Sequence, residues 1–127
     1  SVVVPAVLPV TVDQNGKVYV SNAEIVNHST AAVQVSSVTL TAENGWTLVP
    51  YASDMSHAKV DSNQIGFKIN SAQTSKTGST EQFELTSPWQ IAEEESLTLS
   101  YDAVVSALSQ PVTNANILCV LFVVEWA

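Results

Sequence analysis

Only a few residues of this chain have the types and spacings that are found in catalytic or metal-binding sites. Asp13, Asn15 and Gly16 match the opening of a calcium-binding loop, and Glu24 is the twelfth residue counted from Asp13. A calcium loop places a bidentate glutamate at that position. The intervening segment, Lys17–Val20, alternates like a β-strand, and Asn-Gly is a strong hairpin signal. The pattern therefore favours a plain hairpin turn over a calcium site.

The histidines and carboxylates likewise form no recognised metal motif. Asp54, His57 and Asp61 fall in one segment at uneven spacing, and His28 is distant in sequence. A zinc protease would need a His-Glu-x-x-His helix, which the sequence lacks. The acidic triplet Glu93–Glu95 is typical of a solvated charge run. We predict no metal ion and no cofactor.

Nucleophilic catalysis has no support in the sequence. Cys119 is the only cysteine, and it lies inside an apolar run, where we expect a small buried hydrophobe without a disulfide partner. No Gly-x-Ser-x-Gly elbow is present. We therefore expect no catalytic residues and predict that the protein is not an enzyme.

Two covalent modifications are formally available. Asn27-His28-Ser29 is an N-glycosylation sequon, which matters only in a secretory host. An intramolecular isopeptide bond would need a lysine on an early strand, an asparagine on the last strand and a buried carboxylate between them. Lys17, Asn116 and Glu84 have the required types. Lys17 follows a turn glycine and should face solvent, which argues against this bond.

The tryptophans raise the question of a sugar-stacking platform. Trp46 and Trp126 fall in alternating or apolar segments, so we expect them to pack in the core. Trp89 follows Pro88 and is the tryptophan that we expect to be exposed. A glycan is accordingly kept as an alternative partner.

Composition narrows the class of protein. The 127 residues suffice for one domain, residues 1–127, and only 13% are charged where about 25% is typical. Twelve carboxylates against four lysines give a net charge of −8, which argues against nucleic acid and against anionic membrane surfaces. No stretch approaches the roughly 20 apolar residues of a membrane helix. Ser, Thr, Asn and Gln fill the polar positions, as is typical of secreted surface proteins.

Period-two alternation dominates the chain. It predicts roughly eight or nine short strands separated by turn signals, which is typical of a single antiparallel β-sandwich, jelly-roll or immunoglobulin-like. Turns are expected at residues 13–16 and 44–45, and loops at residues 51–62 and 70–80. The parity of the apolar residues changes at Ser36-Ser37, which predicts a β-bulge. Residues 103–109 are expected to form a short helical turn.

The last strand is predicted to be the most deeply buried. Ile117–Val124 is an unbroken apolar run, typical of a central strand covered on both faces. We expect at least six of its eight side chains to be almost fully buried.

The first twelve residues are the unusual part of the sequence. Ser1–Val12 carries no charge, and Pro5 and Pro9 lack the N–H group that a central strand needs. Such an apolar segment must be covered, either as the first strand of its own sandwich or by another copy of the chain. The side chains expected to mediate assembly are apolar and are Val2, Val3, Val4, Val7 and Leu8.

Two stretches carry a resemblance to a known group of proteins. They are EIVNHSTAAVQVSSVTLTAENGWTL, from Glu24 to Leu48, and the closing LTLSYDAVVSALSQPVTNANILCVLFVVEWA. Together they resemble secreted β-sandwich surface proteins of Gram-positive bacteria, including relatives of the biofilm fibre protein TasA. The resemblance implies an exported jelly-roll subunit. In the fibre-forming members, a strand of one subunit completes the sheet of the next.

These observations predict an extracellular structural protein at the cell surface. We expect it to self-assemble into a fibre or surface layer, with Ser1–Val12 as a donor strand for a neighbouring copy. A head-to-tail contact of this kind does not close and therefore gives filaments. The alternative is a carbohydrate-binding or adhesive module of a larger surface protein.

Overall fold

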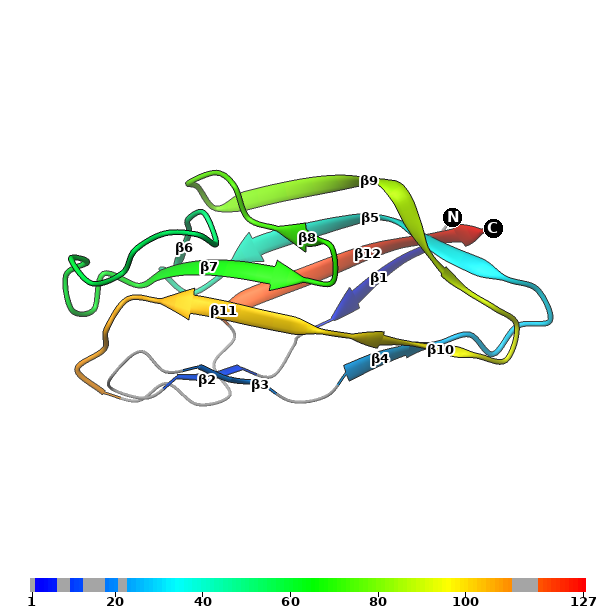
Figure 1. The fold of residues 1–127 in the computed structure, drawn as a ribbon, viewed down its shortest axis with the longest axis horizontal. Helices are drawn as coiled ribbons and strands as arrows, with labels where there is room; N and C mark the ends of the chain where they lie inside the picture. Colours follow the sequence, from blue (N-terminus) through cyan, green and yellow to red (C-terminus); the bar gives the residue numbers. More distant parts are fainter. Residues whose placement is uncertain (1, 7–9, 13–17, 21–22, 111–116) are drawn as a thin grey trace.

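The computed structural model describes residues 2–6, 10–12, 18–20, 23–110 and 117–127. Within these ranges the ordered elements are all β-strands, so the predicted all-β class is confirmed (Figure 1). The strands are β1 (Val2–Ala6), β2 (Val10–Val12), β3 (Val18–Val20), β4 (Ala23–Val26), β5 (Val33–Ala42), β6 (Thr47–Leu48), β7 (Gln64–Ile69), β8 (Ala72–Gln73), β9 (Thr80–Ile91), β10 (Ser96–Leu99), β11 (Tyr101–Val105) and β12 (Leu118–Trp126).

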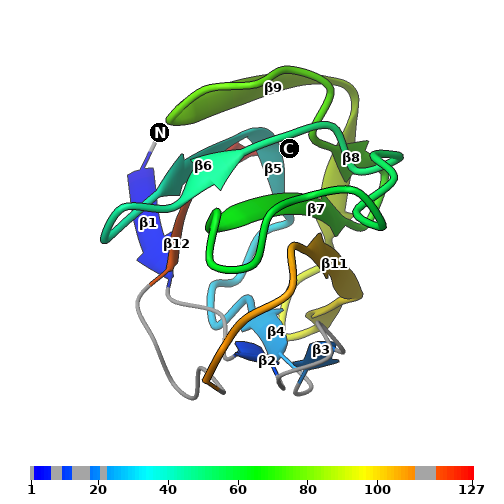
Figure 2. The same cartoon turned by 90° about the vertical axis from the view of Figure 1, so that its left-hand side faces the viewer.

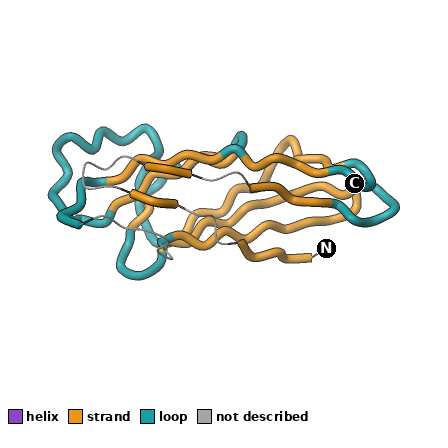
Figure 3. Tube along the Cα trace, turned by 90° about the horizontal axis from the view of Figure 1, so that it is seen from below, coloured by secondary structure: helices purple, strands orange, loops and turns teal. Residues whose placement is uncertain are grey.

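The larger layer is a four-stranded antiparallel sheet with the order β1-β12-β5-β9. The apolar strand β12 lies between β1 and β5, in the central position that its composition predicts. Strands β1 and β9 form the two edges of this sheet (Figure 1). Because β1 runs antiparallel to β12, Val2 lies opposite Val124, and the beginning of β1 and the end of β12 lie at the same end of the sandwich (Figure 3).

The second layer is built from shorter pieces. Strands β11, β7 and β6 form one sheet, β8 pairs with β7, and β10 pairs with β4. Strand β10 leads directly into β11, so these pieces follow one another along the layer (Figure 1). The chain crosses between the layers at Asn44-Gly45, where both residues have positive φ, as an Asn-Gly turn requires. The pair β6–β7 is parallel, unlike its neighbours.

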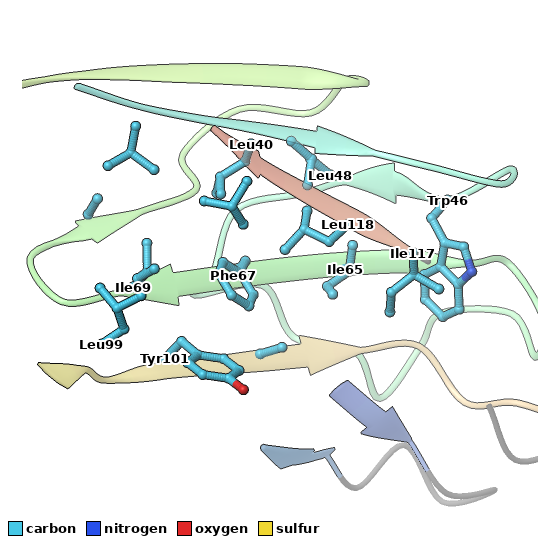
Figure 4. Packing of buried hydrophobic residues seen from close by; sticks show 14 of the residues in the cluster. Leu40, Trp46, Leu48, Ile65, Phe67, Ile69, Leu99, Tyr101, Ile117 and Leu118 are labelled. Atoms are coloured by element: carbon cyan, nitrogen blue, oxygen red, sulfur yellow. The ribbon is translucent and has the colours of Figure 1, made fainter. Parts of the chain in front are cut away.

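The two layers face each other (Figure 2), and the buried side chains of the core lie between them (Figure 4). Leu40 and Leu118 of the larger sheet belong to the same buried cluster as Ile65, Phe67 and Tyr101 of the second layer. The rings of Phe67 and Tyr101 lie 5.9 Å apart with their planes tilted by 36°. Alternate residues of β7, β11 and β12 supply this cluster, which is the packing of a β-sandwich.

The predicted bulge in β5 is confirmed. The pairing of β5 with β9 changes register between Val35 and Ser37, and the pairing of β12 with β5 shifts between Val123 and Val124. The shift lets Val35 and Val38 both face the core with no exposed area. One extra residue therefore keeps apolar side chains inside on both sides of the irregularity.

The prediction that β12 is covered on both faces is wrong. Ile117, Leu118, Val120 and Phe122 are buried, whereas the intervening side chains, Cys119, Leu121, Val123 and the final Val124, are half-buried. The larger sheet is covered by the second layer on one face only, so the apolar run alternates in burial after all.

Two of the three tryptophan predictions are also wrong. Trp46 is buried as expected. Trp89 is only 9% exposed and its Nε1 donates to Ser71 Oγ at 3.0 Å, which ties β9 to the turn between β7 and β8. Trp126 is 68% exposed, because it lies opposite Val33, the first residue of β5, at the end of the sheet.

Two local predictions need correction as well. Residues 103–109 form no helical turn: Ala103 to Val105 complete strand β11, paired with β7. Residues 70–80, expected to be a plain loop, contain β8 and the buried Thr74. The Thr74 hydroxyl donates to Val49 O at 2.7 Å and accepts from Phe67 N at 3.0 Å. A polar segment is thus anchored by one satisfied buried hydroxyl.

Candidate assembly interface

Strand β1 is the part of the predicted assembly segment that the structure places. It pairs with β12 over five residues, with Val3 opposite Val123 and Val4 opposite Phe122. Pro5 lies opposite Leu121, and a proline is tolerated there because β1 is an edge strand. Of the predicted assembly residues, Val2, Val3 and Val4 therefore belong to β1. Val7 and Leu8 lie outside the described residues.

The segment Ser1–Val12 is not one continuous arm. After β1, strand β2 pairs antiparallel with β3, with Val10 opposite Val20 and Val12 opposite Val18, as the predicted hairpin requires. Its turn residues lie outside the described part of the chain. The pairing of β1 with β12 is within one chain, which is what the first-strand alternative predicts. Self-assembly therefore cannot be argued from an unpaired arm.

The strand that receives β1 is strongly apolar. On β12, Val120 and Phe122 face the core with 0% and 1% exposure, and Leu121 and Val123 are half-buried on the opposite face. Without β1, the main-chain groups of Val120–Val124 on that side would lose their strand partner. An unpaired, apolar strand edge is the kind of surface that takes up another strand.

A groove of about 640 Å³ lies near the other edge of the larger sheet, between β9 and the segment that contains β8. Phe83 and Leu85 of β9 line it and are half-buried against the core. Its other lining residues are mostly hydroxyl, amide and charged side chains, including Gln73, Gln82 and Glu84. No sequence pattern predicts this groove, because its two walls, residues 71–76 and 81–87, are close in sequence but belong to different layers of the fold.

Glu81 forms one end of that groove and is the chain's buried carboxylate among the described residues. Its two oxygens accept from Ser75 N at 3.0 and 3.2 Å, from Ser75 Oγ at 2.8 Å and from Lys76 N at 3.0 Å. Three donors satisfy this charge without a salt bridge. The contacts hold residues 75–76 against β9, so Glu81 shapes the groove and is not available as a reactive group.

The asparagine of the sequon, Asn27, is buried and joins two segments by hydrogen bonds. Asn27 is 5% exposed, and its Nδ2 donates to Ala31 O at 2.9 Å and to Ile91 O and Ala92 O at 3.1 Å. Its Oδ1 accepts from the main chain and the hydroxyl of Ser29. The amide that a glycan would need is therefore consumed in joining the end of β4 to the end of β9.

Asp54, His57 and Asp61 are not brought together as metal ligands. Asp54 Oδ1 accepts from Ser56 N at 2.9 Å, and Asp61 Oδ1 accepts from Ser109 N at 2.9 Å. Hydrogen bonds to the charged form lower the pKa of both carboxyl groups, from the side chain and main chain of Ser109 for Asp61 and from the main chain and side chain of Ser56 for Asp54. No group of three His, Cys, Asp or Glu side chains within the described ranges could hold a metal ion.

The remaining sequence candidates are scattered over the surface. Glu24, on β4, is exposed, and Asp13, Asn15 and Gly16 lie outside the described residues. Glu84 is exposed, so it is not the buried carboxylate that an isopeptide bond needs; Lys17 and Asn116 are again not described. Glu93–Glu95 lies in an exposed turn. Cys119 is half-buried, less covered than predicted.

A tyrosine–aspartate pair marks the surface of the second layer. Tyr51 Oη donates to Asp102 Oδ2 at 2.8 Å, and this hydrogen bond, with burial and the nearby negative charge, raises the pKa of Tyr51. The pair joins the 51–62 loop to β11.

Comparisons with known proteins assign this chain to no family. No family model matches the chain, and neither a curated protein nor a solved structure matches it. In the described ranges there is no helix long and apolar enough to cross a membrane. Function has to be inferred from the residues and geometry of this chain.

Proposed function

We propose that this protein is an extracellular structural subunit that self-assembles into a fibre or surface layer through its N-terminal strand. The observation that carries the proposal is the position of β1. It is a short edge strand of the larger sheet, no second strand of the described residues pairs with it, and its partner β12 contains the apolar run Leu118–Val124. Exposed strand edges of this kind are templates for pairing between chains.

Exchange of β1 between copies would preserve its contacts. A β1 strand that left its own β12 could form the same five pairs with the β12 of a neighbour, from Val2–Val124 to Ala6–Val120. Such exchange is a low-cost route to association because no new complementary surface has to arise. Each chain gives one strand and receives one, and the resulting head-to-tail contact forms an open chain unless the rotation closes a ring.

The extracellular setting is supported by composition. Few residues are charged, and the polar positions are mostly Ser, Thr, Asn and Gln. The resemblance to secreted surface sandwiches agrees with this setting.

Deletion of residues 1–9 tests the proposal. Sedimentation of the full chain at rising concentration should show growing assemblies, whereas the shortened chain should stay monomeric. It should also unfold more easily, because β12 loses its partner. A synthetic peptide of residues 1–12, added in excess, should restore part of the lost stability.

The peptide separates assembly from simple instability. A scrambled peptide of the same composition is the control and should have no effect. If the full chain stays monomeric at all concentrations, or if the shortened chain assembles equally well, the proposal is wrong.

A second candidate function is suggested by the groove beside β9. Its hydroxyl and amide side chains, together with Phe83, are the kinds of groups that bind sugars, as in a carbohydrate-binding or adhesive module. A glycan array with the wild type and a Gln82→Ala variant tests this reading. Selective binding that Gln82→Ala weakens would favour the module over the fibre subunit.

A further inference from the structure

The larger sheet has a second open edge, on the strand farthest from β1. Strand β9 pairs with β5, with partners opposite Thr80–Glu84 and Trp89–Ile91. Among the described residues, no strand pairs with the other side of β9. Nor does any turn or loop in those ranges form a main-chain hydrogen bond with Gln82–Ser87. This six-residue stretch therefore presents its main chain to an added strand.

The same stretch supplies apolar contacts for an added strand. Phe83 and Leu85 alternate with the exposed Gln82 and Glu84, and both line the groove beside β9. Strand addition combines main-chain hydrogen bonds with pockets for alternate side chains. The β9 edge offers both, and the groove leaves room beside it.

We propose that the Gln82–Ser87 edge of β9 receives strand β1 of a second copy of this chain, so that the larger sheet continues from one subunit to the next. This inference rests on the proposed self-assembly and adds β9 as a further contact surface between copies. Strand β1 stays the edge of its sheet whichever copy supplies β12, and no strand of the described residues pairs with its outer side.

Strand direction favours this occupant. The order β1-β12-β5-β9 is antiparallel at every step, so β1 and β9 run in opposite directions. A copy placed alongside without rotation therefore brings its β9 antiparallel to β1 and continues the alternation. The contact uses different edges of the two copies and does not close, which gives a filament.

The length and charge of the N-terminal segment also favour β1 as the strand that binds the β9 edge. Strand β1 has five residues, close to the six of the open stretch on β9. Each chain has a net charge of −8, and β9 carries Glu81 and Glu84, so an acidic segment would be repelled. Ser1–Val12 has no charge at all. Pro5 on β1 and Pro88 on β9 confine the pairing to a short stretch, which limits indiscriminate aggregation.

Cysteine cross-linking tests the contact directly. In a Cys119→Ala background, chains with Val3→Cys are mixed with chains carrying Gln82→Cys, Glu84→Cys or Thr86→Cys, and oxidised. Within one chain β1 and β9 are separated by two strands, about 14 Å, so a disulfide between them must join two copies. We expect a covalent heterodimer with at least one β9 position. Thr98→Cys, exposed on β10 of the other layer, is the matched control and should give none.

A proline on β9 provides the second measurement. Thr86 is exposed and has no partner on β5, so Thr86→Pro should block the open edge while leaving the β5 ladder intact. We expect it to abolish filaments, with Thr86→Ala assembling like the wild type. Filaments that persist in Thr86→Pro, together with no cross-link at any β9 position, would overturn this inference and leave the proposed function standing. A wild type that is monomeric, or that binds a glycan in the groove as a monomer, would overturn both.

Discussion

Asn27 is a buried polar residue whose hydrogen bonds join segments far apart in the chain. Its amide joins the 27–31 turn to the end of β9, and its own N–H donates to Glu95 O at 2.8 Å. Because Asn27 is buried, its loss leaves carbonyl groups without a donor. Asn27→Ala should lower the free energy of unfolding by about 1–3 kcal/mol in urea denaturation. The exposed neighbour Thr30→Ala should change it by less than about 0.5 kcal/mol. Equal effects of the two variants would contradict this role.

Asp61 should make the folded chain less stable at acidic pH. Its carboxylate accepts from Ser109 N and its own N–H donates to Ala107 O at 2.8 Å, so it fastens the 51–62 loop to the segment after β11. The pKa of Asp61 is lowered from 3.8 in the folded chain, so its stabilising contribution is complete above that ordinary value and is lost as pH falls through the folded pKa. Urea midpoints of wild type and Asp61→Asn should therefore converge in acid. A constant difference at every pH would argue against this hydrogen bond.

At the scale of single strands, the two faces of β12 differ in burial. Phe122 is 1% exposed in the core, whereas Leu121 is half-buried on the outer face. Phe122→Ala should lower the free energy of unfolding by about 3–5 kcal/mol, and Leu121→Ala by about 1 kcal/mol. Chemical denaturation of the two variants measures the difference. Similar large losses would mean that something also covers the outer face.

Gly66 shows how closely β7 approaches its surroundings. A Cβ at this position would lie 2.8 Å from Pro50 O and Tyr51 Cα and 2.9 Å from Val104 Cγ2. Because the first two are main-chain atoms, Gly66→Ala should destabilise the fold by about 1–3 kcal/mol. Gly78→Ala is the matched control, since its Cβ would meet nothing within 4 Å and should change stability little. Thermal unfolding of both variants checks the contrast.

The strands that the sequence pattern predicts well are those whose signals are local. The parity change at Ser36-Ser37 and the Asn44-Gly45 turn both follow from neighbouring residues, and both are confirmed. The exposure of Trp126 and the burial of Trp89 depend on where each strand ends relative to the other layer. Periodicity carries no information about that, so these two expectations failed together.

The same limit applies to the candidate interface. An uncharged N-terminal segment with two prolines indicates an edge strand, and β1 is one. Its pairing with its own β12 depends on the sheet order, and the groove depends on how residues 71–76, just before β9 in the chain, are placed in the other layer. Strand order comes from contacts distant in sequence, which single-sequence patterns do not encode.

On the scale of the whole molecule, the larger sheet of the sandwich has two different edges, and no strand of the described residues pairs with the outer side of either. The strands run along its long axis, with loops gathered at the ends (Figure 3). Strands β1 and β9 bound the larger sheet on opposite sides, so repeated pairing between them would extend the sheet sideways from copy to copy. Subunits joined in this way would follow one another perpendicular to the strands. Neighbouring strands would lie about 4.8 Å apart, as in any sheet.

Electron microscopy of the negatively stained full chain, purified and examined over a range of concentrations, tests self-assembly most directly. We expect unbranched filaments that lengthen with concentration and disappear when residues 1–9 are deleted. Isolated particles of monomer size at every concentration would contradict the account.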